Sequence, residues 1–341
     1  MNTGRFFSSG EGGQAVCGLC PRRCLIAPGG GGECGVRFNR SEKLPFYGFV
    51  TALAVDPIEK KPLYHFRPGT DILSAGFAGC NLHCPFCQNW QISQNVHART
   101  AGGRGRFYSP AELAAAAAKT AGQSAIAYTY SEPLVHIEFL LDCMTEARKA
   151  GTANVLVSNG CINPEAAAEI LALTSAANID LKCFSEETYT KVLGGKLSAV
   201  TDFIRMAVEK GVHLELSTLV VPGLNDSRQE LGKCRDFIVE LQGGTVPWHL
   251  SAYHPNWKWT APSTDPAFLV DVAGQAREKL PYVYTGNITA SKGGFNDTLC
   301  PGCGKILISR RGYKTDTSGL SRKTENPLYF CTSCGQRAPV T

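Results

Sequence analysis

The sequence predicts an α/β fold in which strands alternate with helices along a mostly parallel sheet. Short apolar runs rich in β-branched residues alternate with helical periodicity between about residues 71 and 285. Cysteine clusters lie outside this alternation, near both ends of the chain. Strands separated by helices form parallel sheets, and six repeats fit either a doubly wound sheet or a partial (β/α)6 TIM barrel. We expect three parts: a Cys-rich metal-binding segment with an extended lead-in (1–70), the partial barrel (71–285) and a zinc-ribbon-like module (286–341).

The expected strands and helices follow each other closely. Ser109, Pro110 and Glu112 have the residue types of a helix N-cap, first helical position and capping box. Further helices are expected at 135–149, from Asn163, and at 186–193, 200–210, 227–241 and 266–279. Strands are expected at 72–77, 124–130, 154–159, 178–182, 213–221 and 246–253, and 282–286 closes the region.

Composition limits the classes of function. The chain has 341 residues and 15 cysteines, with no apolar run near the length of a membrane span and no apolar leader at its start. Clustered cysteines in a long chain without a leader favour metal binding in the reducing cytoplasm over disulfides. The formal charge of +5 falls to about zero once thiolate-bound metals are counted, so charge gives little support to nucleic-acid binding. Four single cysteines are expected to be small buried side chains: Cys143, Cys161, Cys183 and Cys234.

The loop after the first strand carries Cys80, Cys84 and Cys87 with three and then two residues between them. Three thiolates on one loop can bind three corners of a 4Fe–4S cluster, which in proteins normally has four cysteine ligands. One iron is then left open for a substrate or cofactor. A zinc knuckle that borrows a distant ligand is the alternative interpretation. His83 is expected to be a spacer, because a fourth ligand would block the open iron.

Polar residues follow the other strands, at the end of a parallel sheet where active sites gather. They are Glu132 after the second strand, Asn159 after the third, Asp180 and Lys182 at the end of the fourth, and His254 after the sixth. A surface ion pair is the alternative for Asp180 and Lys182, and a loop histidine with no binding role is an equal alternative for His254.

Four cysteines near the start have the spacing C-x2-C-x3-C-x9-C: Cys17, Cys20, Cys24 and Cys34. Zinc is the first choice for this set, because all-cysteine structural sites commonly bind zinc. A second iron–sulfur cluster stays open, since four cysteines serve either metal. The stretch from Asp56 to His65 follows an extended lead-in. On composition alone it is interpreted as a solvated turn.

The C-terminal part has two C-x2-C pairs separated by 27 residues: Cys300 with Cys303 and Cys331 with Cys334. This pattern is typical of a zinc ribbon. The hairpin expected between the pairs is basic, and it carries Arg310, Arg311, Lys314, Arg322 and Lys323. Binding of RNA or of an acidic protein is one hypothesis, and a solvated hairpin is the favoured alternative.

Together these motifs resemble the radical S-adenosylmethionine (SAM) superfamily, and within it the activases of glycyl-radical enzymes such as pyruvate formate-lyase. The cysteine loop with Phe86 before its last cysteine, DLK at 180–182, VVPGLND at 220–226 and AYH at 252–254 match in order. TYSEP at 129–133 lies where the superfamily usually has Gly-Gly-Glu, and both glycines are absent. The resemblance implies that Phe86, Glu132, Asn159, Asp180, Lys182 and His254 contribute to SAM binding beside a 4Fe–4S cluster.

A narrower resemblance spans nearly the whole chain. DPIEKKPLYHF at 56–66, CQNW at 87–90 (which begins with the third loop cysteine), YVYTGNI at 282–288 and the cysteine clusters at both ends resemble the AmmeMemoRadiSam system radical SAM enzymes. This implies AMMECR-like and Memo-like protein partners and a flavodoxin- or ferredoxin-type electron donor. It also favours a functional role for the stretch 56–65.

Three functions therefore follow as hypotheses. The leading one is a SAM-cleaving enzyme whose 5′-deoxyadenosyl radical takes hydrogen from a protein or RNA substrate that the sequence does not identify. The second is an activase that places a glycyl radical on a partner enzyme. The third is a non-catalytic zinc-ribbon adaptor for nucleic acid or protein.

Overall fold

A computed structural model of the chain describes residues 4–39, 44–94, 96, 105–120, 124–288, 295–322 and 328–341. Its centre is an eight-stranded sheet with the order β13-β12-β11-β10-β9-β8-β6-β5. Every neighbouring pair is parallel except β5 with β6. The strands of this sheet are β5 (Ala52–Pro57), β6 (Asp71–Gly76), β8 (Ala125–Thr129), β9 (Ala153–Ser158), β10 (Ala176–Asp180), β11 (His213–Val220), β12 (Trp248–Ala252) and β13 (Val283–Gly286).

Consecutive parallel strands are neighbours throughout the sheet, and β5 and β13 are its two edges. A doubly wound sheet would reverse its strand order at a switch point, so that alternative is excluded. Because β-α-β crossovers are right-handed, the connecting helices all cover one face. These helices are α3 (Pro110–Ala118), α4 (Ile137–Lys149), α5 (Pro164–Leu171), α7 (Leu197–Glu209), α8 (Arg228–Glu240) and α9 (Pro266–Arg277).

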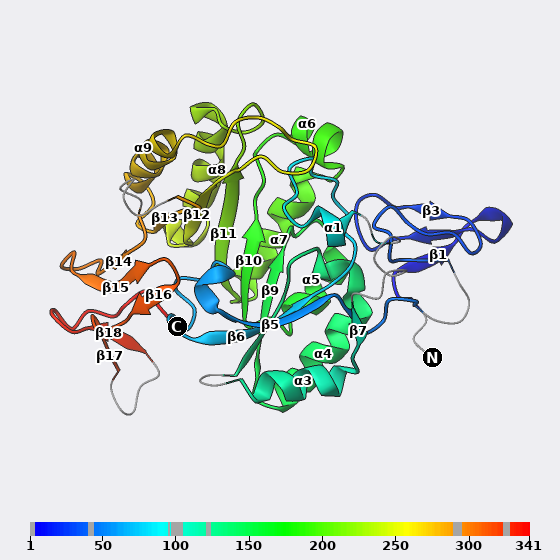
Figure 1. Ribbon diagram of the computed structural model, residues 1–341, viewed down its shortest axis with the longest axis horizontal. Helices are drawn as coiled ribbons and strands as arrows, with labels where there is room; N and C mark the ends of the chain where they lie inside the picture. Colours follow the sequence, from blue (N-terminus) through cyan, green and yellow to red (C-terminus); the bar gives the residue numbers. More distant parts are fainter. Residues whose placement is uncertain are drawn as a thin grey trace.

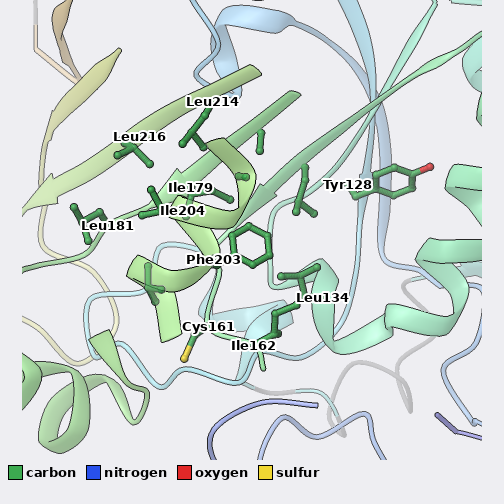
Figure 2. Packing of buried hydrophobic residues seen from close by; sticks show 14 of the residues in the cluster. Tyr128, Leu134, Cys161, Ile162, Ile179, Leu181, Phe203, Ile204, Leu214 and Leu216 are labelled. Carbon is green, nitrogen blue, oxygen red and sulfur yellow. The ribbon is translucent and has the colours of Figure 1, made fainter. Parts of the chain in front are cut away.

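The main core lies between this helical layer and the sheet. Figure 2 shows Ile179, Leu214 and Leu216 of the strands packed around Phe203 and Ile204 of α7. Side chains alternate between the two faces of a strand. Asn178 and Ser217, which neighbour Ile179 and Leu216 in the chain, therefore point to the opposite face, where they line a cavity.

The lead-in covers part of that opposite face. Ile58, Leu63 and Phe66 pack on the small side chains at the amino ends of β8, β9 and β10. The backbone N–H groups of Tyr64 and His65 donate to the buried carboxylate of Glu215 on β11, at 3.0 and 2.7 Å. The lead-in is therefore anchored to the centre of the sheet.

The expected elements are confirmed with small shifts of their ends. The capping box is present: the Ser109 hydroxyl accepts from the Glu112 N–H, and the Glu112 carboxylate accepts from the Ser109 N–H. The four single cysteines are buried, as expected. No helix within the described residues combines the length and apolar character needed to cross a bilayer.

The two cysteine modules lie on opposite sides of the sheet (Figure 1). The N-terminal module is a three-stranded sheet, and the C-terminal module has one three-stranded and one two-stranded sheet. A small pair, β4 (Phe49–Val50) with β7 (Arg106–Phe107), lies beside the main sheet. The remaining elements are β1 (Phe7–Ser9), β2 (Ala15–Cys17), β3 (Leu25–Ile26), α1 (Trp90–Ser93), α6 (Glu186–Thr188), β14 (Thr298–Leu299), β15 (Ile306–Arg311), β16 (Lys314–Asp316), β17 (Leu320–Arg322) and β18 (Tyr329–Cys331), with 3-10 turns at Glu11–Gly13, Ile58–Lys60, Pro133–His136 and Gln242–Gly244 and a π turn at Tyr189–Leu193.

Two sequence interpretations are wrong. The stretch 56–65 is not a solvated turn, because Asp56, Glu59, Lys61 and His65 are all buried. The basic side chains of the hairpin are not all exposed. Arg310 is 1% exposed, and its Cζ lies 4.0 Å from the centroid of the Tyr64 ring. This guanidinium attaches the C-terminal module to the lead-in, and because it is buried a nucleic acid cannot reach it. Lys323 of the same hairpin lies outside the described residues.

Candidate active site

One cavity of about 760 Å³ lies at the carboxyl ends of the parallel strands. Its lining comes from the cysteine loop, the lead-in, the strands and the tip of the β15–β16 hairpin. Of the residues that the sequence nominated, it brings together Cys80, Cys84, Cys87, Phe86, Glu132, Asn159, Asp180 and Lys182.

His254 is not part of this lining. It is exposed, and its Nδ1 lies 3.2 Å from the Ser263 hydroxyl. The residues that line the cavity from the same strand are His249 and Ser251. They lie on β12 itself, whereas His254 follows the strand by two residues.

The cysteine loop is held by hydrogen bonds from several parts of the chain. The His83 N–H donates to the Leu193 carbonyl at 2.8 Å, and the Lys258 N–H donates to the Pro85 carbonyl at 3.0 Å. The Asn81 amide donates to the Cys161 carbonyl at 2.7 Å. These contacts connect the loop to three other parts of the chain.

The three cysteines line the cavity, and the sulfurs of Cys80 and Cys87 take part in hydrogen bonds there. The Leu82 N–H lies 3.3 Å from Cys80 Sγ, the Asn159 amide 3.7 Å from the same sulfur, and the Ser93 hydroxyl 3.3 Å from Cys87 Sγ. Hydrogen bonds to cysteine sulfur are a common feature of iron–sulfur sites. The donor set therefore fits a cluster.

The distances between the three loop sulfurs distinguish this site from one that binds a single metal ion. In the described part of the chain, the one group of three or more His, Cys, Asp or Glu ligand atoms that all lie within 4.8 Å of one another belongs to the C-terminal cysteines. The loop sulfurs are spread more widely. Three thiolates that each bind a different iron need this wider spacing. His83 is directed elsewhere, since its Nδ1 lies 2.9 Å from Gln94 Oε1.

Glu132 connects the ends of β8 and β9 beneath the cavity. Its carboxylate accepts from the Ser158 hydroxyl at 2.7 Å, the Asn159 N–H at 2.8 Å and the Leu134 N–H at 3.0 Å. Burial raises the pKa of Glu132 to about 7, although the three hydrogen bonds act in the opposite direction and lower it. Each carboxylate oxygen has two lone pairs, so capacity for a ligand donor is left.

Asp180 and Lys182 form an ion pair at 2.7 Å on the cavity wall. Burial alone would lower the pKa of Lys182, but the charges of Asp180 and Cys84 outweigh burial and raise it. The ammonium group therefore keeps its charge. This is a charged pair inside a cavity and not the surface pair that the alternative interpretation predicted.

Tyr130 occupies a position that the sequence analysis did not nominate. Its φ of 71° is left-handed, a conformation that favours glycine and is costly for a bulky side chain. Its hydroxyl donates to the Asp56 carboxylate at 2.5 Å. The backbone thus keeps a glycine-like conformation where the superfamily pattern has glycine, and the tyrosine ring connects this turn to the lead-in.

Four further lining residues were missed: Asn178, Ser217, His249 and Ser251. Lys60, from the stretch 56–65 that the narrower resemblance favoured as functional, also lines the cavity. Asp56 pairs with Lys60 and Lys61 at 2.7 and 2.6 Å. The signal available in the sequence was single polar residues at alternate positions of otherwise apolar strands.

Several known proteins are similar to this chain. The model of the "Radical SAM superfamily" matches residues 76–233. The uncharacterised protein MJ0808 of Methanocaldococcus jannaschii is 34% identical over 100% of this chain and 99% of its own length. The pyruvate formate-lyase-activating enzyme of Listeria monocytogenes is 24% identical over 53% of this chain and 75% of its own. Among solved structures, Streptococcus suis SuiB bound to S-adenosylmethionine has 15% identity and a TM-score of 0.46, covering 60% of this chain and 48% of SuiB.

Proposed function

The chain belongs to the radical SAM superfamily, and on that premise we propose that it is an enzyme that cleaves SAM reductively and takes a hydrogen atom from a second substrate. The observation that carries the proposal is the convergence of the three loop cysteines with Asp180 and Lys182 on one cavity. The proposed scaffold is a partial (β/α)6 barrel over residues 71–285, flanked by the metal-binding segment 1–70 and the zinc-ribbon module 286–341.

Cys80, Cys84 and Cys87 would hold a 4Fe–4S cluster through three of its irons. When bound, the cluster supplies one electron that splits SAM into methionine and the 5′-deoxyadenosyl radical. Phe86 is 3% exposed and lines the cavity next to the cysteines, so it helps exclude water.

The polar residues of the cavity then position SAM. The Lys182 ammonium would pair with the SAM carboxylate, and the Asp180 carboxylate would accept hydrogen bonds from the ribose hydroxyls. Glu132 would accept from the amino group with its remaining lone pairs. Asn159 holds the cysteine loop in position, because its side-chain amide donates to Asn81 Oδ1 at 2.9 Å and is directed toward Cys80 Sγ. His254 would need its loop to rearrange before it reached SAM.

The substrate would enter the part of the cavity away from the cysteines. Lys60, Asn178, Ser217 and His249 offer both hydrogen-bond donors and acceptors there. Ligand cavities are typically about 300–1,000 Å³, so this one suits SAM together with a single side chain or nucleotide. A protein or RNA substrate would therefore present one extended residue to the site.

An activase function is the second candidate, and it is favoured by the similarity to pyruvate formate-lyase-activating enzymes. It requires that the hydrogen come from a glycine of a partner enzyme. A glycyl-radical EPR signal on that partner, dependent on SAM, would distinguish it from the leading proposal.

The proposed partners are a flavodoxin- or ferredoxin-type electron donor and, from the narrower AmmeMemoRadiSam resemblance, AMMECR-like and Memo-like proteins. Zinc is proposed for the C-terminal cysteines, since Cys300 and Cys334 sulfurs lie 3.6 Å apart and those of Cys303 and Cys331 3.7 Å apart. Tetrahedral zinc with Zn–S bonds of about 2.3 Å places its sulfurs about 3.8 Å apart.

The decisive experiment incubates anaerobically reconstituted protein with dithionite and SAM and measures 5′-deoxyadenosine and methionine. We expect both products in equal amounts from the native chain and none from Cys84→Ala. Cys234→Ala is the matched control, because this cysteine is buried in α8 away from the cavity. Undiminished cleavage by Cys84→Ala would rule out the assigned cluster site. Zinc in every site with no brown colour would support the adaptor hypothesis.

A further inference from the structure

The four N-terminal cysteines share one small enclosure. Cys17, at the end of β2, and the three that follow it all line the same cavity together with Leu19, Arg22, Arg37, Asn81 and Val135. Cys17 and Cys34 are buried, and Cys20 and Cys24 are half-buried. The backbone brings them together, since the Cys17 N–H donates to the Cys24 carbonyl at 2.9 Å. Four thiols around one cavity provide the type and number of ligands that zinc and iron–sulfur clusters use.

The spacing of these sulfurs does not fit one zinc ion. A tetrahedral zinc holds its sulfurs about 3.8 Å apart. The C-terminal cysteines meet this condition, with sulfur pairs at 3.6 and 3.7 Å. Among the described residues, no three of the N-terminal sulfurs form a group within 4.8 Å of one another. The loop cysteines Cys80, Cys84 and Cys87 share this open spacing.

A buried cation faces the N-terminal sulfurs. Arg37 is 2% exposed, and its Nε donates to Cys17 Sγ at 3.3 Å. The same guanidinium donates to both oxygens of the buried Glu138 on α4, at 2.9 and 3.0 Å. Hydrogen bonds to cysteine sulfur and burial are the features by which proteins set the potential of iron–sulfur clusters.

The enclosure lies directly against the Cys80 loop. Asn81, which follows Cys80 in the chain, is part of the lining around the four N-terminal cysteines. The Arg22 guanidinium donates to the Asn81 carbonyl at 2.8 Å. Gly79 has a φ of +83°, and a Cβ there would overlap the carbonyl oxygen of Cys34. The two cysteine loops therefore touch through their backbones, and only glycine fits between them.

We infer that Cys17, Cys20, Cys24 and Cys34 bind a second 4Fe–4S cluster, one ligand on each iron, immediately beside the cluster of the Cys80 loop. Zinc, the first choice from spacing in the sequence, fits the C-terminal set and not this one. The inference rests on the proposed function only for the identity of the neighbouring cluster.

The test measures iron, sulfide and zinc in anaerobically purified protein, before and after reconstitution. The native chain is expected to hold about eight irons and about one zinc. A variant with Cys80, Cys84 and Cys87 replaced by alanine is expected to keep about four irons and about one zinc. Native protein with about four irons and about two zincs would overturn the inference without any variant.

The remaining variants separate this inference from the proposed function. Cys20→Ala/Cys24→Ala is expected to lose half of the iron, and Cys234→Ala to lose none. If the N-terminal variant held no iron while the triple variant did, the proposed function would fail and the inference would stand. Iron that persisted when both sets were replaced would be adventitious and would overturn the inference.

Spectroscopy tests the adjacency independently of the metal count. After reduction by dithionite, the native chain is expected to give an EPR signal broadened by spin–spin interaction. Each single-cluster variant is expected to give a simple, narrower signal. A native spectrum equal to the sum of the two variant spectra would contradict the placement of the clusters side by side.

Discussion

The two cysteine modules at the ends of the chain differ in how their sulfurs are spaced and in what they contact. The C-terminal sulfurs lie within 4.8 Å of one another, and Cys303 and Cys334 are exposed. The N-terminal sulfurs are more widely spaced and enclosed, and their loop touches the Cys80 loop. The modules lie on opposite sides of the sheet (Figure 1).

Each module is attached by a buried arginine, but in a different environment. Arg37 pairs with the Glu138 carboxylate at 2.9 Å. Arg310 donates to neutral groups, including the Tyr64 carbonyl at 2.7 Å and the Thr298 hydroxyl at 2.9 Å, and its Nε lies farther, at 3.8 Å, from the buried carboxylate of Glu59. Four cysteines alone therefore do not define a module's role. The N-terminal set lies against the Cys80 loop, whereas the C-terminal module contributes Gly312 and Tyr313 to the wall of the main cavity.

Loss of the zinc proposed for the C-terminal cysteines is expected to have the largest effect. Cys331→Ser should abolish zinc binding, and structural zinc contributes on the order of 10 kcal/mol of apparent folding free energy. Hydrogen exchange should then lose its protection over β15 to β18 while the parallel sheet keeps it. Iron content should not change. Retained protection in the zinc-free variant would mean that the apolar cluster around Leu307 and Ile308 folds the module alone.

Arg37→Met should destabilise the N-terminal attachment next most strongly. The substitution leaves the Glu138 carboxylate buried without its cation, which typically costs about 3–5 kcal/mol. Chemical denaturation measures this free energy of unfolding. The paired variant Arg37→Met/Glu138→Leu should recover most of it, because removing both charges is often nearly neutral. A cost below about 1 kcal/mol in the single variant would show that the carboxylate reaches water.

Acid should destabilise the folded chain through His65, which lies between the main sheet and the C-terminal segment. Burial lowers the pKa of His65 from 6.5 to about 3, and its ring contacts the Pro339 carbonyl and the Tyr284 hydroxyl, both at 2.6 Å. The unfolded chain takes up a proton below pH 6.5, whereas the folded chain does not until pH 3. The contribution of His65 to stability is therefore complete above pH 6.5 and is lost as the pH falls toward 3.

At pH 5 this linkage amounts to about 2 kcal/mol. Denaturation of the native chain and of His65→Gln at pH 7 and pH 5 measures it, because other groups titrate equally in both proteins. The native chain should lose about 2 kcal/mol more than the variant. Equal losses in the two proteins would show that His65 is not held neutral.

Arg22→Met should have the smallest effect. It removes one hydrogen bond to the Asn81 carbonyl, typically about 1 kcal/mol, and leaves all cysteines in place. The exposed neighbour Arg23 provides the control, since Arg23→Met should leave the free energy of unfolding unchanged. A loss of iron from the Arg22 variant would mean that this contact holds the two cysteine loops together more strongly than one hydrogen bond allows.

Much of the fold could be predicted from the sequence because its signals are local. Apolar runs located the parallel strands, and Ser109 with Glu112 located the start of α3. The cysteine loop and the strand-end residues Glu132 and Asp180 were found because active sites gather at the carboxyl ends of parallel strands. His254 follows the same rule but lies outside the cavity, because its side chain is exposed and its Nδ1 lies 3.2 Å from the Ser263 hydroxyl.

Other features depended on partners distant in the chain. Glu215 is fully buried and binds the backbone of Tyr64 and His65, about 150 residues earlier. Arg310 is basic in the sequence but buried in the structure, because Tyr64 and the lead-in enclose it. Charge and burial of such residues cannot be judged from neighbours in the sequence.

The alternation of strands and helices, the cysteine sets and the polar residues at the strand ends can all be identified in the sequence. Local periodicity and ligand spacing suffice for these, because each depends on residues close together in the chain. The distances between the sulfurs of each cysteine set, and the contact of one set with the Cys80 loop, follow only from the tertiary structure. Those properties depend on packing between residues far apart in the chain, such as Arg37 on Glu138 and Gly79 on Cys34.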